Sequence, residues 1–383
     1  MWNIFRKKSN EKESIINNSE SSHICYWVKR MVFLSLLATA SYALKSGNEK
    51  DLNVIPKSGF FDMHAHTAWT WAKGSWIRIS ESIRNSYKFP IYLKAFWVSK
   101  EELREEWDAI VFRKISERLK ASEYVDSSVI LAMDWFVGSD NELDLENTEI
   151  YIPNEFVYKE TSKYDNLYFW ASVNPNRLDA IERLEKVHGQ WAILIKWLPS
   201  IMNIDPSSEK NIPFYNKLIE LDIPLLVHIW DEHSFTKADN SLSQPEKLEL
   251  PLSMGVKVIA AHVWTLWEKD NVRSHDRLIN MFRKYPNLYA DISSLTQINK
   301  MRFLKEILSN NDLKWRLLYG SDMPLINTAL VSPLYYISQI TIAQIYDILS
   351  TDNIYDKDVK LKYAIWVGED IFIKPKEFFN INK

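Results

Sequence analysis

Eight short apolar runs, separated by charged stretches of helical length, follow one another from Gly59 to Pro324 and constrain the fold more than any other feature. Apolar runs of this length are typical of strands buried on both faces of a parallel sheet, and the stretches between them are typical of covering helices. The runs are 59–66, 129–136, 167–175, 191–199, 223–230, 256–264, 287–293 and 316–324. The sequence therefore predicts an α/β fold, a (β/α)₈ TIM barrel with each run as one strand.

A long insertion separates the first run from the second. It contains a predicted helix from about 100 to 120, and Ser99 with Glu102 three residues later has the pattern of a capping box at its start. We expect this insertion to decorate the barrel.

Ionisable side chains close five of the eight runs, namely the first, fourth, fifth, sixth and eighth. They are His64 and His66, Lys196, His228, His262 and Asp322. A barrel brings the carboxyl ends of all its strands to one mouth, so residues far apart in the sequence meet there. The sequence thus predicts that these six side chains form one site.

This set of residues suits a metal ion. His64 and His66 are two positions apart, so on a strand they leave the same face and can reach one ion together. Neutral imidazole is the commonest metal ligand, and two histidines plus a carboxylate with an open position are typical of catalytic zinc. A single histidine at such a place is more often a hydrogen-bonded core residue, but four histidines and Asp322 at equivalent strand ends favour a shared metal site.

The composition excludes other classes of site. Cys25 is the only cysteine among 383 residues, so the chain forms no internal disulfide and no structural zinc site of thiolates. A net charge of −3 without a basic stripe argues against nucleic acid as a partner. The sequence has neither a G-x-G-x-x-G fingerprint nor a P-loop, so nucleotide-dependent chemistry is disfavoured.

The N-terminal part is predicted to be separate from the barrel, with residues 1–55 as an extension and 56–383 as the barrel domain. Residues 31–44 are apolar, but 14 residues are fewer than the roughly 20 that span a bilayer. We expect a cytoplasmic protein, in which this segment is a helix packed on the barrel or an arm that touches a membrane. The alternative is an export or anchor signal, which about 30 preceding residues disfavour.

Several motifs together resemble the amidohydrolase superfamily, in particular the branch called amidohydrolase-related or amidohydrolase type 2. The resemblance covers roughly Gly59 to the end of the chain. It is carried by D-x-H-x-H (Asp62, His64, His66), by the histidines that close the fifth and sixth runs, and by G-S-D-x-P in the eighth. It extends to IKWLPS with IDP downstream (195–206), PLLVHIWDEHSF (224–235), GVKVIAAH (255–262), YPNLYADIS (285–293) and LLYGSDMP (317–324). Ile229 and Trp230 stand where such proteins often carry glycine after the strand-five histidine.

The resemblance implies a role for each site residue. His64, His66 and His228 would bind metal, while His262 would bind a second metal or contact the substrate. Asp322 would touch the metal-bound water, act as general base and then pass the proton to the leaving group. The cofactor is then a divalent metal, with zinc expected and Mn, Fe, Co or Ni accepted by the same ligands.

The chemical state of Lys196 determines whether the site holds one metal ion or two. A lysine carboxylated by CO₂ is an anion that can bridge two ions, and several superfamily members use this device on strand four. An unmodified lysine would instead anchor a substrate carboxylate or pair with Asp322. Both interpretations stay open.

The implied function is a metal-dependent hydrolase that cleaves an amide, lactone or other ester bond with metal-bound hydroxide. The alternatives are a metal-dependent non-oxidative decarboxylase on the same fold and a catalytically silent binding barrel. The partner is a small-molecule substrate, and a homo-oligomer is compatible with the sequence.

Tryptophans close to the site residues bear on the substrate. They are Trp69, Trp71, Trp197, Trp230 and Trp264. If several face the mouth, the substrate has an apolar or aromatic portion, and otherwise they pack in the core. Glu232 and His233 lie in the loop after the fifth run, where they either orient ligands or face solvent. His23, His188 and His275 are expected to lie away from the site.

Overall fold

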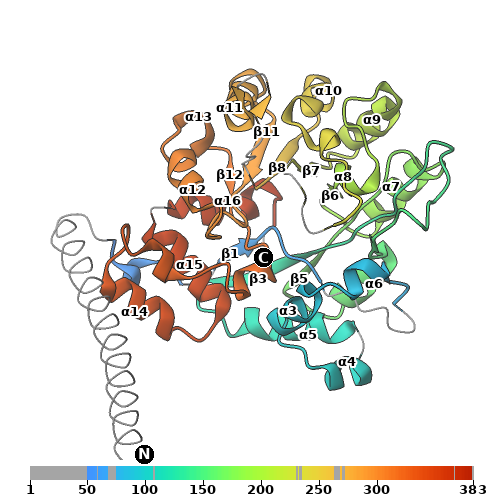
Figure 1. The fold of residues 1–383 in the computed structure, drawn as a ribbon. Helices are drawn as coiled ribbons and strands as arrows, with labels where there is room; N and C mark the ends of the chain where they lie inside the picture. Colours follow the sequence, from blue (N-terminus) through green and yellow to red (C-terminus); the bar gives the residue numbers. More distant parts are fainter. Residues whose placement is uncertain are drawn as a thin grey trace, which may run out of the picture.

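Eight parallel strands form the centre of the computed structural model (Figure 1). The structure describes residues 50–57, 59–67, 75–106, 108–229, 232, 235–262, 268–269, 272–365 and 367–381. The barrel strands are β1 (Phe60–Asp62), β3 (Val125–Leu131), β5 (Leu167–Trp170), β6 (Ile195–Trp197), β7 (Leu225–His228), β8 (Val258–Ala261), β11 (Leu288–Asp291) and β12 (Leu317–Leu318). Each overlaps one of the eight predicted runs.

The strands form two parallel ladders that meet at two seams. The ladders are β1-β3-β5 and β12-β11-β8-β7-β6. One seam is joined by the bridge between Ala171 and Ile195, and the other by the bridge between Ala65 and Met323. With these joins the strands follow one another in sequence order around the ring, and the chain is an α/β TIM barrel as predicted.

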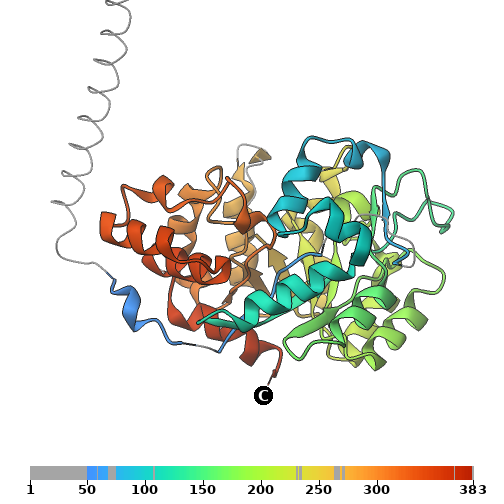
Figure 2. The ribbon, with the colours of Figure 1, turned by 90° about the horizontal axis from the view of Figure 1, so that it is seen from below.

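Helices surround the strands on the outside (Figures 1 and 2). They are α2 (Glu81–Arg84), α3 (Lys88–Ala95), α4 (Lys100–Glu106), α5 (Ala109–Lys120), α6 (Asn154–Thr161), α7 (Ala180–Gly189), α8 (Pro199–Met202), α9 (Ile212–Glu220), α10 (Glu249–Met254), α11 (Ser274–Lys284), α12 (Met301–Leu308), α13 (Asn311–Lys314), α14 (Ile342–Ser350), α15 (Ile354–Ala364) and α16 (Glu369–Phe378). Two short antiparallel pairs, β2 (Arg78–Ile79) with β4 (Ile150–Tyr151) and β9 (Glu268–Lys269) with β10 (Val272–Arg273), lie outside the ring.

Side chains alternate between the two faces of each strand, so the buried residues form two clusters, one inside the ring and one between the ring and the helices. Leu226 of β7 belongs to the cluster inside the ring, whereas its neighbours Leu225 and Val227 belong to the cluster between the ring and the helices. At one end of the ring, Phe379 follows α16 and packs against Trp170, with 4.8 Å between the ring centroids. These aromatic side chains fill the amino-terminal end of the barrel.

The predicted boundaries were wrong in detail, because most strands are shorter than the predicted runs and two elements differ further. The second strand runs Val125–Leu131 rather than 129–136, because its polar start is buried through a hydrogen bond from Ser128 Oγ to Asp62, 3.1 Å long. The predicted helix 100–120 is two helices, α4 and α5. Its capping box is confirmed, since Ser99 N donates to Glu102 and Glu102 N donates to Ser99 Oγ.

The N-terminal predictions lie mostly outside the described residues. The apolar segment 31–44 is not among them, and the division at residue 55 stays a prediction. Among the residues that the structure does describe, no helix is both long and apolar enough to cross a membrane.

Candidate metal centre

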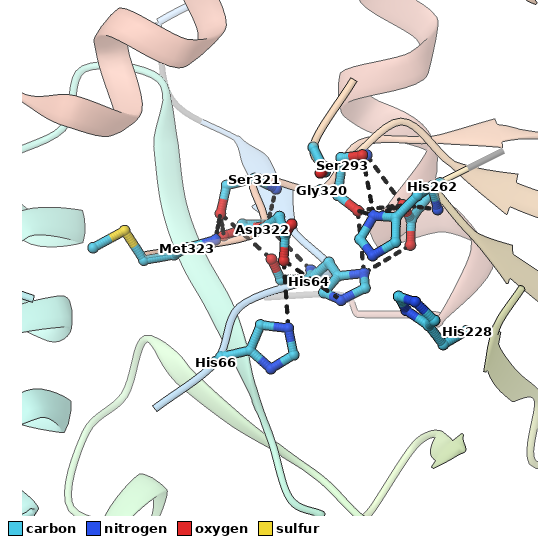
Figure 3. A network of polar contacts seen from close by, with 12 residues as sticks. His64, His66, His228, His262, Ser293, Gly320, Ser321, Asp322 and Met323 are labelled. Atoms are coloured by element: carbon cyan, nitrogen blue, oxygen red, sulfur yellow. Dashed lines mark hydrogen bonds and ion pairs between the residues drawn. The ribbon is translucent and has the colours of Figure 1, made fainter. Parts of the chain in front are cut away.

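The predicted site residues converge at the carboxyl ends of the strands. Figure 3 shows the four imidazoles facing a common space beside Asp322. The ring of His64 lies 5.2 Å from that of His66 and 4.9 Å from that of His262, and His262 lies 5.2 Å from His228, measured between centroids. The sixth residue, Lys196, lines the same cavity as His66, His228, His262 and Asp322.

His64 is oriented by a carboxylate from the far side of the ring. Its Nδ1 donates to Asp291 Oδ2 at 2.8 Å, so the lone pair of the neutral ring is on Nε2. That Nε2 atom is buried and has no hydrogen-bond partner within the described part of the chain. A buried acceptor without a partner is costly, and a metal ion would satisfy it.

Asp322 faces two of the imidazoles. Its Oδ1 lies 3.4 Å from His66 Nε2 and 4.0 Å from His64 Nε2. One ligand atom from each of these three residues falls within 4.8 Å of the others, which is close enough to share one ion. Burial raises the pKa of Asp322, but the influence of His262 and the hydrogen bond with His66 outweigh it and hold the pKa well below the usual range. Asp322 is therefore an ionised carboxylate.

Two strand-end residues adopt the left-handed backbone conformation, His262 at φ 61° and Asp322 at φ 63°. Such strain costs about 1–3 kcal/mol per residue and is concentrated at functional sites. Hydrogen bonds hold both residues in place: His262 N donates to Asp291 Oδ1 at 3.0 Å, and Asp322 N donates to His64 O at 2.8 Å.

His228 ends β7 and approaches the loop that follows it. Its Nε2 lies 3.5 Å from Glu232 Oε2, so Glu232 lies at the site rather than in a solvated loop. Burial, with His262 next, lowers the pKa of His228 well below its ordinary value, and burial lowers the pKa of His262 to about 3. Burial also lowers the pKa of His64. These rings are therefore neutral, which is the form that binds metal.

Lys196 is buried, and no described carboxylate forms an ion pair with it. It points into the ring in the same alternation as Leu194, and its Nζ has no hydrogen-bond partner among the residues described. Burial lowers its pKa to about 8, against the influence of Asp291, Asp322 and Glu232. A sizeable fraction of the amine is therefore neutral near physiological pH.

Asp62 at the end of β1 is hydrogen-bonded to β3 and to the chain segment that follows β12. It accepts hydrogen bonds from Ser128 Oγ and from Ser321 N and Oγ, at 3.1, 2.7 and 2.6 Å. The backbone of Gly320 passes so close that a Cβ there would lie 2.8 Å from His64 Cβ. The two ends that carry His64 and Asp322 are thereby fixed against each other.

A cavity of about 510 Å³ opens from this cluster, and we call it the site cavity. Its walls are mostly apolar and include Ile83, Ile91, Tyr92, Met133, Leu198 and Phe235. Trp197 is not among them: it is buried in the core, where Nε1 donates to Val173 O at 2.8 Å. The other four tryptophans of the sequence prediction lie outside the described residues.

The sequence prediction missed Asp291, Ser293 and Lys300. The first was detectable, because Asp291 ends the seventh strand just as the predicted ligands end theirs. Ser293 Oγ lies 2.8 Å from His262 Nδ1, but no pattern distinguishes this serine from others. Of the histidines set aside, His188 is exposed at the end of α7, while His23, His233 and the side chain of His275 lie outside the description.

These donors fit a divalent cation. They comprise imidazoles, three of which have a buried ring nitrogen without a hydrogen-bond partner among the described residues, and an ionised carboxylate within reach. Nitrogen and oxygen ligands of this kind suit zinc and its first-row neighbours.

The chain is similar to known proteins in sequence and in fold. The family model described as Amidohydrolase matches residues 61–334. No curated protein matches the sequence. The structure is similar to an uncharacterized TIM-barrel protein from Bordetella bronchiseptica, with 13% identity, a TM-score of 0.52, and coverage of 84% of this chain and 98% of that chain. This likeness supports the fold alone.

Two further solved structures are similar at TM-scores below 0.5. An amidohydrolase 2 from Bifidobacterium longum subsp. infantis has 13% identity and a TM-score of 0.42, and the match covers 85% of this chain and 100% of that chain. A 5-carboxyvanillate decarboxylase from Sphingomonas paucimobilis has 9% identity and a TM-score of 0.47, with coverage of 84% and 99%.

Proposed function

Because the chain belongs to the amidohydrolase family, we propose that it is a metal-dependent hydrolase that cleaves an amide, lactone or other ester bond of a small molecule. The observation that carries the proposal is the pairing of His64 with Asp291. This pairing leaves His64 Nε2 buried, without a hydrogen-bond partner among the described residues, and 4.0 Å from the ionised Asp322.

His64, His66, His228 and Asp322 would hold one divalent cation, with His262 beside it. When bound, such an ion lowers the pKa of water to about 7 and polarises a carbonyl oxygen. Asp291 keeps His64 in the tautomer that presents Nε2 to the ion. The burial of these groups excludes bulk water, which strengthens every charge interaction among them.

Asp322 acts as the general base in this proposal. It is ionised and lines the site cavity, so it can accept a proton from the attacking water at its carboxylate. The same carboxyl group then gives the proton to the leaving nitrogen or oxygen. His66 Nε2 lies 3.4 Å from Asp322 Oδ1, so both groups would reach the same ion. His262 is proposed to contact the carbonyl oxygen of the substrate or a second ion.

Lys196 is proposed to be carboxylated when two ions are bound. The neutral amine adds to CO₂ and releases one proton, and the product is an anionic carbamate. Asp291, Asp322 and Glu232 all act on Lys196 electrostatically, so a further anion there needs a second cation to balance it. Metal-free protein should therefore regain more activity with metal plus bicarbonate than with metal alone. Equal recovery in both conditions would indicate a single ion and an unmodified lysine.

The reaction class is tested by product analysis in heavy-oxygen water. Metal-loaded protein is screened against esters, lactones and N-acyl compounds, and the proposal predicts an acid product that carries one heavy oxygen from the solvent. Release of CO₂ from an aromatic acid without such incorporation would favour the decarboxylase alternative. Binding without turnover across the screen would favour a silent binding barrel.

A further inference from the structure

A buried ion pair on α15 contacts the chain segment that follows β12. Lys362 Nζ lies 2.6 Å from Asp358 Oδ2, one helical turn earlier, and the two residues are 0% and 2% exposed. Neither residue lines the site cavity, and neither takes part in the proposed metal binding or proton transfer. Lysine and aspartate are almost never fully buried unless they are paired, so each of these two residues depends on the other.

The pair holds two consecutive residues directly after β12. Lys362 Nζ donates to Gly320 O at 2.9 Å, and Tyr319 OH donates to Asp358 Oδ2 at 3.0 Å. The ammonium group also lies 4.9 Å from the centroid of the Tyr319 ring. Because β12 ends at Leu318, these contacts hold the chain just beyond the strand ladder.

Gly320 connects this pair to the candidate metal centre. An added Cβ at Gly320 would lie 2.8 Å from His64 Cβ, so the glycine backbone packs directly against His64 (Figure 3). Two residues further on, Asp322 N donates to His64 O at 2.8 Å. A displacement of Gly320 would therefore change the position of Asp322 relative to His64, whose Nε2 lies 4.0 Å from Asp322 Oδ1.

The ion pair is weak evidence for a contribution to stability. Taking two charges out of water costs free energy, and apolar residues of similar volume often stabilise a core equally well. An apolar side chain, however, cannot donate a hydrogen bond to Gly320 O. What distinguishes Lys362 from such a side chain is thus the position that it gives to the backbone after β12.

We propose that Lys362, held by Asp358, is a positioning residue that sets the Asp322 carboxylate relative to His64 through its bond to Gly320. This inference rests on the proposed function in that a metal ion binds at His64 and Asp322, but it does not depend on which bond of the substrate is cleaved. Lys362 acts from outside the site cavity, on the backbone rather than on the ion.

The test uses the full chain loaded with Co²⁺, whose visible absorption spectrum reports the ligands and the coordination geometry. Lys362→Met removes the donor and keeps a side chain of similar length. It should weaken Co²⁺ binding about tenfold or more in competition with a chelator, and it should alter the spectrum, because Gly320 O loses the bond that fixes it. Circular dichroism and the melting temperature are measured on the same samples.

A double variant separates position from stability. Lys362→Met alone leaves Asp358 as a buried carboxylate without its lysine, which lowers the melting temperature. Adding Asp358→Asn removes that charge and keeps an oxygen that can accept from Tyr319. The double variant should therefore regain melting temperature but neither the metal affinity nor the spectrum of the wild type. It also serves as the test protein if Lys362→Met alone does not fold.

Lys360→Met is the matched control, because Lys360 lies on the same helix but pairs with Asp347 of α14 at 3.0 Å. It should leave the metal affinity and the spectrum unchanged. The proposal is overturned if folded Lys362→Met binds Co²⁺ like the wild type, if the double variant regains affinity together with melting temperature, or if Lys360→Met causes the same loss. These results would leave the proposed function standing, whereas wild-type protein that binds no Co²⁺ would overturn both.

Discussion

Asp291 shows how one buried carboxylate determines the state of a neighbouring ring. It accepts from His64 Nδ1 at 2.8 Å and from His262 N at 3.0 Å, so its loss would affect both histidines. Asp291→Asn should weaken metal binding about 10–100-fold, because the amide no longer fixes the tautomer of His64. Competition with a chromogenic chelator measures this affinity.

The matched control for that variant is Asp222→Asn, an exposed carboxylate that precedes β7 at the other end of the barrel and pairs with Lys257. It should bind metal like the wild type. An Asp291→Asn protein with unchanged metal affinity would mean that His64 does not use Nε2 as a ligand.

Asp322 tests the proton-transfer step. Asp322→Asn keeps the size and one oxygen but removes the base, so kcat should fall by about 10²–10⁴-fold on a substrate found by screening. The melting temperature should change little, because the amide has the same size as the carboxylate and packs in the same space. Asp205→Asn, which removes a partly exposed carboxylate paired with Lys247, is the control. Near-normal kcat in metal-loaded Asp322→Asn protein would assign the proton to another group, with His262 first.

The elements of the barrel could be predicted from the sequence because each strand is a continuous apolar run. The alternation that points Lys196 and His228 inward is also a sequence property, since strand side chains have a period of two. Strand ends were less predictable. Polar residues at 126–128 concealed the start of β3, because the hydrogen bond from Ser128 to the distant Asp62 is visible only in the folded chain.

Gly320 tests how closely β12 must approach β1. An added Cβ would lie 2.8 Å from His64 Cβ and 3.1 Å from Ser293 Cβ, so the backbone would have to shift. Gly320→Ala should cost about 1–3 kcal/mol of stability, as overpacking does, and should also lower metal affinity. Thermal unfolding and the chelator competition measure the two effects.

Gly189 provides the matched substitution, since a Cβ there meets nothing within 4 Å. Gly189→Ala should leave both stability and metal affinity close to wild type. If Gly320→Ala behaves in the same way, the close approach of β12 to His64 is not needed for the site.

In the whole molecule, aromatic packing occupies one end of the barrel and the candidate site occupies the other. Phe379 and Trp170 close one end, while the histidines and Asp322 occupy the other. The sequence could not predict what surrounds the site cavity. Ile91 and Tyr92 come from the insertion after β1, and Lys300 comes from the segment after β11, so their meeting depends on tertiary contacts that leave no periodic pattern.

The central claim is that the strand ends hold a divalent metal. Metal content of the purified full chain, measured by elemental mass spectrometry, tests it most directly when wild type is compared with a His64→Asn, His66→Asn double variant. Circular dichroism verifies that both proteins are folded. The account predicts at least one divalent ion per wild-type chain and its loss from the folded double variant. Wild-type protein that stays metal-free after incubation with zinc or manganese, or a double variant that keeps the full metal content, would contradict it.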